Sequence, residues 1–158
     1  MLEDRIYNHV DMAITGLNRV KSNIKGKLKG YRTGVRQAAR SVGSDIEQAA
    51  KMNAPVKIDS LIHGVVVSDQ NGYGFSIRVN AMPGNGMMKN MPIYLEFGTG
   101  LFAANYVPTL PKEWQDIARQ FYINGKGKTK AHSFIYPAWN THSPRFKEAA
   151  RSALRSVK

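Results

Sequence analysis

The sequence predicts an α+β fold: an antiparallel β-sheet, made of a hairpin plus further strands, flanked by a long N-terminal helix and a C-terminal helix. Three patterns predict it. Apolar residues recur every three or four positions over the first fifty residues, two alternating segments then flank a turn sequence, and helical spacing returns near the end. We expect one domain, 1–158, with an N-terminal helical region (1–53), a sheet (56–100), an insertion with a short helix and a basic loop (101–132), and a connector with the C-terminal helix (133–158).

The N-terminal helix is predicted by one long apolar stripe, and Gly26, Gly30 and Gly34 interrupt it. Each glycine costs about 1 kcal/mol relative to alanine inside a helix, so we expect a weak or kinked middle, or two helices that share one face. Pro55 is expected to end the helix. The stripe consists of Leu2, Ile6, Val10, Ile14, Leu17, Ile24, Leu28, Tyr31, Val35, Ala39, Val42, Ile46 and Ala50.

The sheet is predicted from three segments. Leu61–Ser68 and Tyr73–Asn80 surround Asp69-Gln70-Asn71-Gly72, whose Asn and Gly favour a hairpin turn. Alternation in Ile93–Phe97 predicts a third strand, which ends at the turn Gly98-Thr99-Gly100. Residues 81–92 are predicted to form a loop.

The rest of the chain is predicted to be mainly helical. Pro111–Phe121 has the spacing of a short helix that begins at a proline. Asn124–Lys130 is a basic, glycine-rich loop, and an aromatic connector follows it. The C-terminal helix is predicted by the spacing of Phe146, Ala149, Ala150, Ala153, Leu154 and Val157.

Charge and composition limit the classes of function. The net charge is +12, of which residues 1–51 carry +5 and residues 126–158 carry +7, while residues 52–125 are neutral. Basic ends favour an anionic partner, either nucleic acid or an acidic protein surface, although basic helix faces can also serve solubility alone. The chain has no cysteine, no signal-peptide pattern and no long apolar run. We therefore expect a soluble protein of a reducing cytoplasm, without a membrane partner.

The candidate chemical motifs do not predict an enzyme. Gly125–Thr129 resembles the end of a phosphate-binding loop, but the motif requires a glycine where Tyr122 stands. The four histidines lack the spacing of a metal site, so no metal and no cofactor is expected. Glu96 is an acidic residue in an apolar segment without a partner carboxylate or histidine at a telling spacing. We expect it to pair with a basic residue of a terminal helix, or to accept N–H groups of the Gly98–Gly100 turn.

The basic residues of the first helix form a candidate contact surface for DNA or for a protein partner. No acidic residue occurs between Met12 and Ser44. Helical spacing predicts a charged ridge, which would contact phosphates without reading sequence. The ridge consists of Lys25, Lys29, Arg32, Arg36 and Arg40, and Lys126, Lys128 and Lys130 of the basic loop are further candidates.

Three motifs in order resemble the head–tail joining, or tail-completion, proteins of long-tailed bacteriophages. The first is the alanine-rich segment that ends in Pro55. The second motif comprises Tyr94, Glu96, Phe97, Gly98 and Thr99, followed by Gly100. The third motif comprises Phe134, Pro137 and Ala138, followed by Trp139. The chain departs from the family at Ile58-Asp59-Ser60, where a Thr-Gly pair is usual, and at Ser133, where proline is common.

The resemblance implies a structural virion protein of the phage neck or tail. Such a protein would act as a subunit of a homo-oligomeric ring, expected to be a hexamer. It would contact adjacent neck or connector proteins and tail-tube or terminator proteins, with double-stranded DNA in the channel as a further partner, and would assemble in the host cytoplasm. Alternatives are a tail-terminator or minor capsid protein, or a non-specific nucleic-acid-binding protein. Within this reading Phe97, Phe134, Tyr136 and Trp139 would join the sheet edge to the C-terminal helix, and Met82, Met87 and Met88 would form a docking loop.

Overall fold

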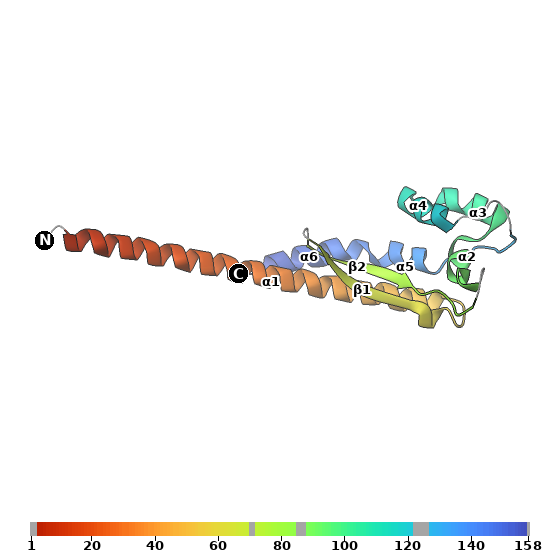
Figure 1. Cartoon of the computed structure of the whole chain (residues 1–158), viewed down its shortest axis with the longest axis horizontal. Helices are drawn as coiled ribbons and strands as arrows, with labels where there is room; N and C mark the ends of the chain where they lie inside the picture. The colour runs from red at the N-terminus through yellow and green to blue at the C-terminus, as the bar shows by residue number, and fades with distance from the viewer. Residues whose placement is uncertain (1–2, 70–71, 85–87, 122–126, 158) are drawn as a thin grey trace.

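The computed structural model has the predicted α+β fold (Figure 1). It describes residues 3–69, 72–84, 88–121 and 127–157, and the side chains of 22–68, 72–84, 88–119 and 127–157. Its elements are α1 (Glu3–Asn53), η1 (Asp59–Leu61), β1 (Ile62–Asp69), β2 (Gly72–Val79), α2 (Met91–Phe97), α3 (Gly100–Tyr106), η3 (Val107–Thr109), α4 (Lys112–Phe121), α5 (Ile135–His142) and α6 (Pro144–Ser156).

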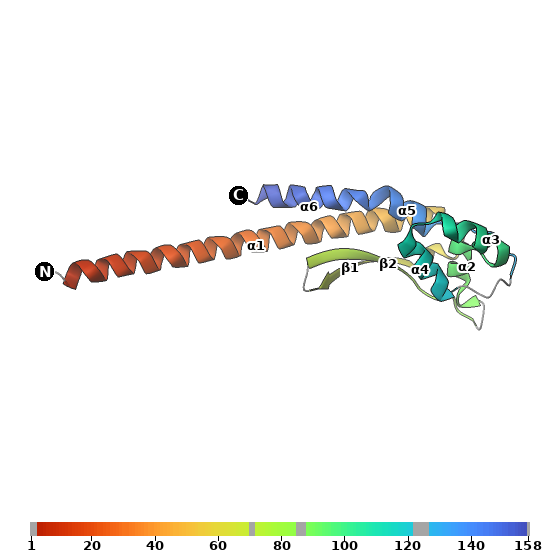
Figure 2. The same cartoon turned by 90° about the horizontal axis from the view of Figure 1, so that it is seen from above.

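α1 is one continuous helix and ends two residues before Pro55, as predicted. Lys57, with φ of 81°, helps to reverse the chain, so β1 runs back along α1. Figure 2 shows α1 between two layers, with α5 and α6 on one side and the hairpin on the other. The N-terminal half of α1 extends beyond both layers (Figure 1).

The predicted hairpin is confirmed. β1 and β2 pair antiparallel in a register that sets Ile62 opposite Val79 and Val66 opposite Phe75. Phe75, Ile77 and Val79 pack against the main core, as their alternation predicted. The two central turn residues, 70 and 71, lie outside the described part of the chain.

The main core lies where α1, the hairpin and α5 meet. Its centre is apolar, and Ile46, Ile62 and Phe134 are fully buried. Phe75 links the layers, since its ring centroid lies 5.1 Å from that of Trp139 and 5.4 Å from that of Phe146. The buried members of this cluster are Val42, Ile46, Ala50, Ile58, Ile62, Phe134 and Ala138.

The prediction of a third strand was wrong. Ile93–Phe97 belongs to the seven-residue helix α2, and the sheet of the described residues has two strands only. Pro92, near the start of α2, suits a first helical turn, and Gly98 ends the helix with φ of 76°. A short apolar run that is buried on several sides satisfies either geometry, so alternation alone did not distinguish the two.

The connector before the terminal helix also differs from the prediction. Residues 135–142 form the separate helix α5, and α6 follows after Ser143. α6 confirms the predicted C-terminal helix and runs antiparallel to α1. It lies close to α1 because the glycines of α1 leave room: a Cβ at Gly34 would lie 2.7 Å from the Cβ of Ala153.

The insertion folds into a second small cluster over the end of the molecule. The predicted short helix is confirmed as α4, and α3 and η3 precede it. Phe97, Leu110 and Ala118 form the buried centre, with Trp114 and Tyr136 packed against it. None of the helices in the described ranges combines the length and hydropathy that a bilayer span requires.

Candidate functional site

Residues 94–100 and 133–139, which hold the second and third motifs of the sequence, meet at Glu96. Its Oε2 atom accepts the backbone N–H groups of Phe134 (2.8 Å) and Ile135 (2.9 Å), and its Oε1 atom accepts that of Tyr136 (2.9 Å). The hydroxyl of Ser133 also donates to Oε1, at 2.5 Å. The carboxylate of α2 therefore caps the N-terminus of α5, and we call this arrangement the clasp.

The hydrogen-bond partners of Glu96 differ from those that the sequence predicted. Neither a basic residue nor the Gly98–Gly100 turn supplies them. N–H groups at a helix start lack partners within the helix, and the positive end of the helix dipole favours an anion there. Glu96 has 2% of its surface exposed, so these four donors replace the water that an exposed carboxylate would bind.

The turn at Gly98–Gly100 depends on its two glycines. Gly98 and Gly100 have φ of 76° and 56°. A Cβ at Gly98 would also lie 3.0 Å from the backbone nitrogen of Ala131. Between the glycines, the N–H of Thr99 donates to the carbonyl of Thr129, and the Thr129 N–H donates to Oγ1 of Thr99, both at 2.8 Å. The turn thereby holds the segment that leads back to Ser133.

The other motif residues have packing positions. Tyr94 and Phe97 are buried, Ala138 lies in the main core and Pro137 is exposed. Trp139 contacts Phe75 of β2, as the predicted connection of sheet and C-terminal region requires. Phe97 differs from that prediction, because it packs with α4 in the second cluster.

The clasp fixes the start of α5 against α2, and its carboxylate is buried. Each oxygen of Glu96 accepts two hydrogen bonds, and water is excluded from the buried carboxylate. A general acid or base must face a substrate in an accessible cleft, which Glu96 does not do.

A basic groove, of about 390 Å³, lies between α1 and the tip of the hairpin. Lys25, Lys29, Arg32 and Arg36 line it, and all four are exposed. Arg40 is exposed further along α1 but does not line the groove. The remaining lining residues are Leu28, Thr33 and Tyr73. Four neighbouring cations within about 16 Å of helix suit an extended anionic partner.

Tyr73 is a lining residue that sequence reasoning missed. The lengths of β1 and α1 indicate its position. Gly64 of β1 lies against Gly43 of α1, and the five further strand residues to Asp69 advance about 16 Å, which is the rise of about eleven helical residues. That brings the hairpin tip level with Arg32.

The other predicted contact residues lie apart from the basic groove. Lys128 and Lys130 are exposed on the segment before α5, at the opposite end of the compact region (Figure 1). Met82 packs against the main core, so it does not form the docking surface predicted for it, whereas Met88 is 47% exposed. Met87 and Lys126 lie outside the described residues.

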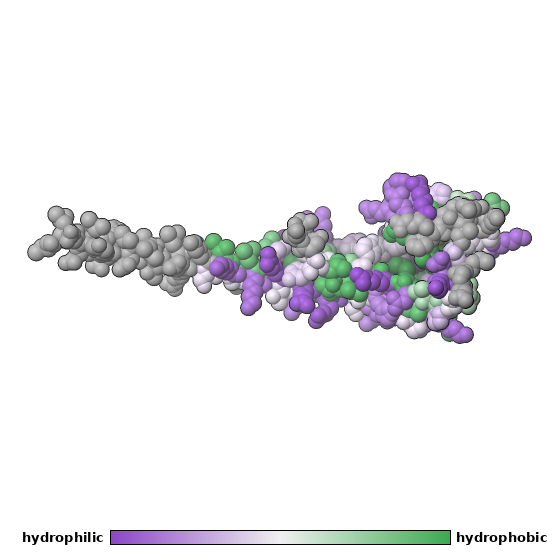
Figure 3. Space-filling model, in the orientation of Figure 1, coloured by the Kyte–Doolittle hydropathy of each residue, from purple (hydrophilic) through white to green (hydrophobic). Residues whose placement is uncertain are grey.

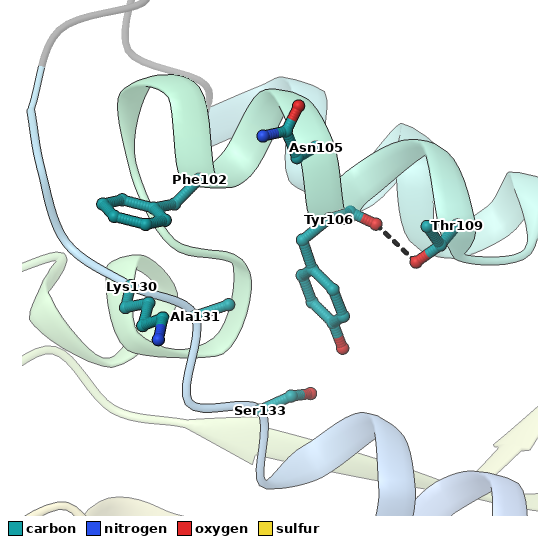
Figure 4. A pocket seen from close by; sticks show the side chains of 7 residues that line it. All are labelled: Phe102, Asn105, Tyr106, Thr109, Lys130, Ala131 and Ser133. Carbon is teal, nitrogen blue, oxygen red and sulfur yellow. Dashed lines mark hydrogen bonds between the residues drawn. The ribbon is translucent and has the colours of Figure 1, made fainter.

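A second cavity, of about 310 Å³, opens between α3 and the segment before α5. Figure 4 shows Phe102 and Tyr106 of α3 on the side that faces Lys130, Ala131 and Ser133, with Asn105 and Thr109 at the edge of the cavity. Burial raises the pKa of Tyr106, and a hydrogen bond with Ser133 opposes that rise. The cavity is open, and Lys130 is the one cation among its lining residues.

The described side chains offer no metal centre, since they include no group of three or more His, Cys, Asp or Glu residues placed to hold an ion. Comparison with known proteins gave no match to any family model, curated protein or solved structure.

Proposed function

We propose that the chain is a structural protein of a bacteriophage neck or tail, a ring subunit that completes the tail and joins it to the DNA-filled head. The observation that carries the proposal is the clasp. Residues 94–100 and 133–139, in which the resemblance to this family is strongest, come together around one buried carboxylate. The motif thus corresponds to a single packed unit of the fold.

Two further observations support an assembly role in which no reaction is catalysed. The N-terminal half of α1 lies outside the compact region (Figure 1). An amphipathic helix in that position is suited to pack against another protein. The acidic residue of the motif, Glu96, accepts hydrogen bonds that hold α2 against the start of α5. A virion location and a ring are part of the proposal, with neck, connector, tail-tube or terminator proteins as neighbours.

The first experiment measures assembly. Purified chain is analysed by light scattering after gel filtration and by negative-stain electron microscopy, alone and with tails from particles that lack it. Rings, either free or only on tails, are expected. In the genome that encodes the chain, a stop codon early in its gene should give unattached heads and tails. Normal infectious particles from that mutant would refute the proposal.

A specific observation also favours non-specific nucleic-acid binding as a second candidate. The basic groove presents four cations that could contact phosphates. If all four did so, the logarithm of the association constant for a DNA duplex should fall with the logarithm of salt concentration with a slope of about −3.6. Lys25→Ala with Arg32→Ala should roughly halve that slope, and Lys128→Ala with Lys130→Ala should leave it unchanged. A weak slope that neither pair alters would remove this candidate.

A further inference from the structure

The N-terminal half of α1 projects beyond the other elements of the fold. Figures 1 and 2 show that neither α6 nor the hairpin runs along its N-terminal half. Contact between α1 and α6 ends near Gly30, where an added Cβ would lie 3.5 Å from the side chain of Val157. Residues 22–30 are exposed throughout. A single helix without tertiary contacts is marginally stable in water, so this segment gains from a partner.

One face of this segment continues the buried face of α1. Ile24 and Leu28 are 54% and 53% exposed, whereas Val35 and Val42 are 8% and 4% exposed. Steps of four and seven residues put all four on one side of the helix. We call the uncovered end, Ile24 and Leu28, the open seam. Figure 3 shows hydrophobic residues beside hydrophilic ones at this end of the described surface.

Positive charge lies along one side of the open seam. Lys25 and Lys29 directly follow the seam residues Ile24 and Leu28, and Arg32 and Arg36 lie further along α1 on the same side. The ion pairs of the described residues involve other cations, namely Lys51, Lys112, Arg119 and Arg145. No acidic residue occurs between Met12 and Ser44, so two copies of this segment packed against each other would bring like charges together.

Both parts of the surface, apolar and cationic, must be matched by one partner. A nucleic-acid backbone would neutralise the cations but would leave Ile24 and Leu28 without apolar contacts. An amphipathic helix with acidic flanks would bury the seam and place carboxylates near the cations. We infer that this segment of α1 binds an acidic amphipathic helix of another protein, with the open seam as its apolar contact. The inference does not depend on the proposed function.

The test uses the full chain and a defined probe. The probe is a fluorescent peptide of four heptads with Leu at the a and d positions and Glu at the e and g positions. A second peptide, with Lys in place of every Glu, controls for charge. In fluorescence anisotropy at physiological salt the acidic peptide should bind and the basic one should not. Hydrogen exchange of residues 22–30 should slow when the acidic peptide binds.

Variants separate the two contributions. Ile24→Ser with Leu28→Ser keeps the charge and should weaken peptide binding by about tenfold or more. Lys25→Glu with Arg32→Glu should weaken it by at least as much. Lys128→Glu with Lys130→Glu, a matched reversal at the other end of the molecule, should change binding by less than about twofold. Because every substituted side chain is exposed, thermal unfolding should be nearly unchanged.

Three outcomes would overturn the inference. If Ile24→Ser with Leu28→Ser does not weaken peptide binding, that binding rests on attraction between charges alone. No peptide binding, together with tight binding of a duplex of about 20 base pairs that only the charge reversal abolishes, would assign the surface to nucleic acid. A dimer of the chain alone that the serine variant dissociates would assign the seam to a second copy. A ring that survives the serine variant would leave the proposed function intact.

Discussion

The carboxylate of Glu96 lies 2.8 Å from the backbone nitrogen of Phe134, a residue thirty-eight positions further along the chain. This contact joins α2 to the start of α5, and the same buried carboxylate accepts three further hydrogen bonds, from Ser133, Ile135 and Tyr136. Its role in stability can be measured directly.

Glu96→Gln should destabilise the protein by about 3 kcal/mol or more in urea unfolding followed by circular dichroism. The amide keeps one acceptor oxygen and turns its NH₂ group towards backbone donors. Glu113→Gln, an exposed change on α4, should stay within about 0.5 kcal/mol. A Glu96→Gln effect below 1 kcal/mol would show that the clasp contributes little.

Gly98→Ala should destabilise the protein by about 2 kcal/mol or more, since φ of 76° is unfavourable for alanine and the added Cβ would approach the backbone of Ala131 and Thr129. Gly26→Ala is the matched change in open space on α1, where nothing lies within 4 Å of the new Cβ. It should stabilise α1 by up to about 1 kcal/mol. Thermal unfolding of both variants provides the comparison, and similar melting temperatures would contradict it.

Glu47 should contribute to a pH dependence of stability. Its hydrogen bond from Lys51 lowers its pKa below the ordinary 4.5, partial burial opposes this, and the Gly64 N–H adds to the lowering. Because the folded-state pKa is depressed, the stabilisation is present above about pH 4.5 and is lost as the pH falls through the folded value. Glu47→Gln should therefore cost about 1 kcal/mol at pH 7 and less at pH 3. Urea unfolding of the parent and the variant at both pH values measures this, and an equal cost at pH 7 and at pH 3 would contradict it.

Tyr106 should ionise late in an alkaline titration followed by tyrosinate absorbance. Burial raises its pKa above the ordinary 10.0, and the charge of Glu96 adds to the rise. Tyr106→Phe should remove the last component of the titration. A raised folded-state pKa also means that this contribution to stability is lost as the pH rises above 10. A curve in Tyr106→Phe that matches the parent would contradict the assignment.

Sequence pattern predicted the elements that are long or have strong local signals. The stripe from Leu2 to Ala50 indicated α1, and Asn71-Gly72 between alternating segments indicated the hairpin. Both rely on periodicity and turn chemistry, which act over a few residues. α2 was missed because five residues are too few for a period to be decisive, although Pro92 and Gly98 mark the ends of a helix.

The partners of Glu96 could not be predicted in the same way. They are backbone N–H groups, which every residue except proline has, and only the tertiary fold brings the start of α5 to α2. The basic ridge was predictable because it lies on one helix. Its neighbour Tyr73 depends on the relative lengths of a strand and a helix, which local patterns do not report.

The antiparallel pairing of α1 and α6 sets where added sequence would emerge. Val157 lies beside Gly30, so an affinity tag fused to the C-terminus would start level with the open seam along α1, and a flexible tag could reach round the helix to cover Leu28. The N-terminus lies at the far tip of α1 (Figure 1). For binding work, then, a removable N-terminal tag leaves this surface accessible, and a C-terminal tag acts as a tethered competitor for it.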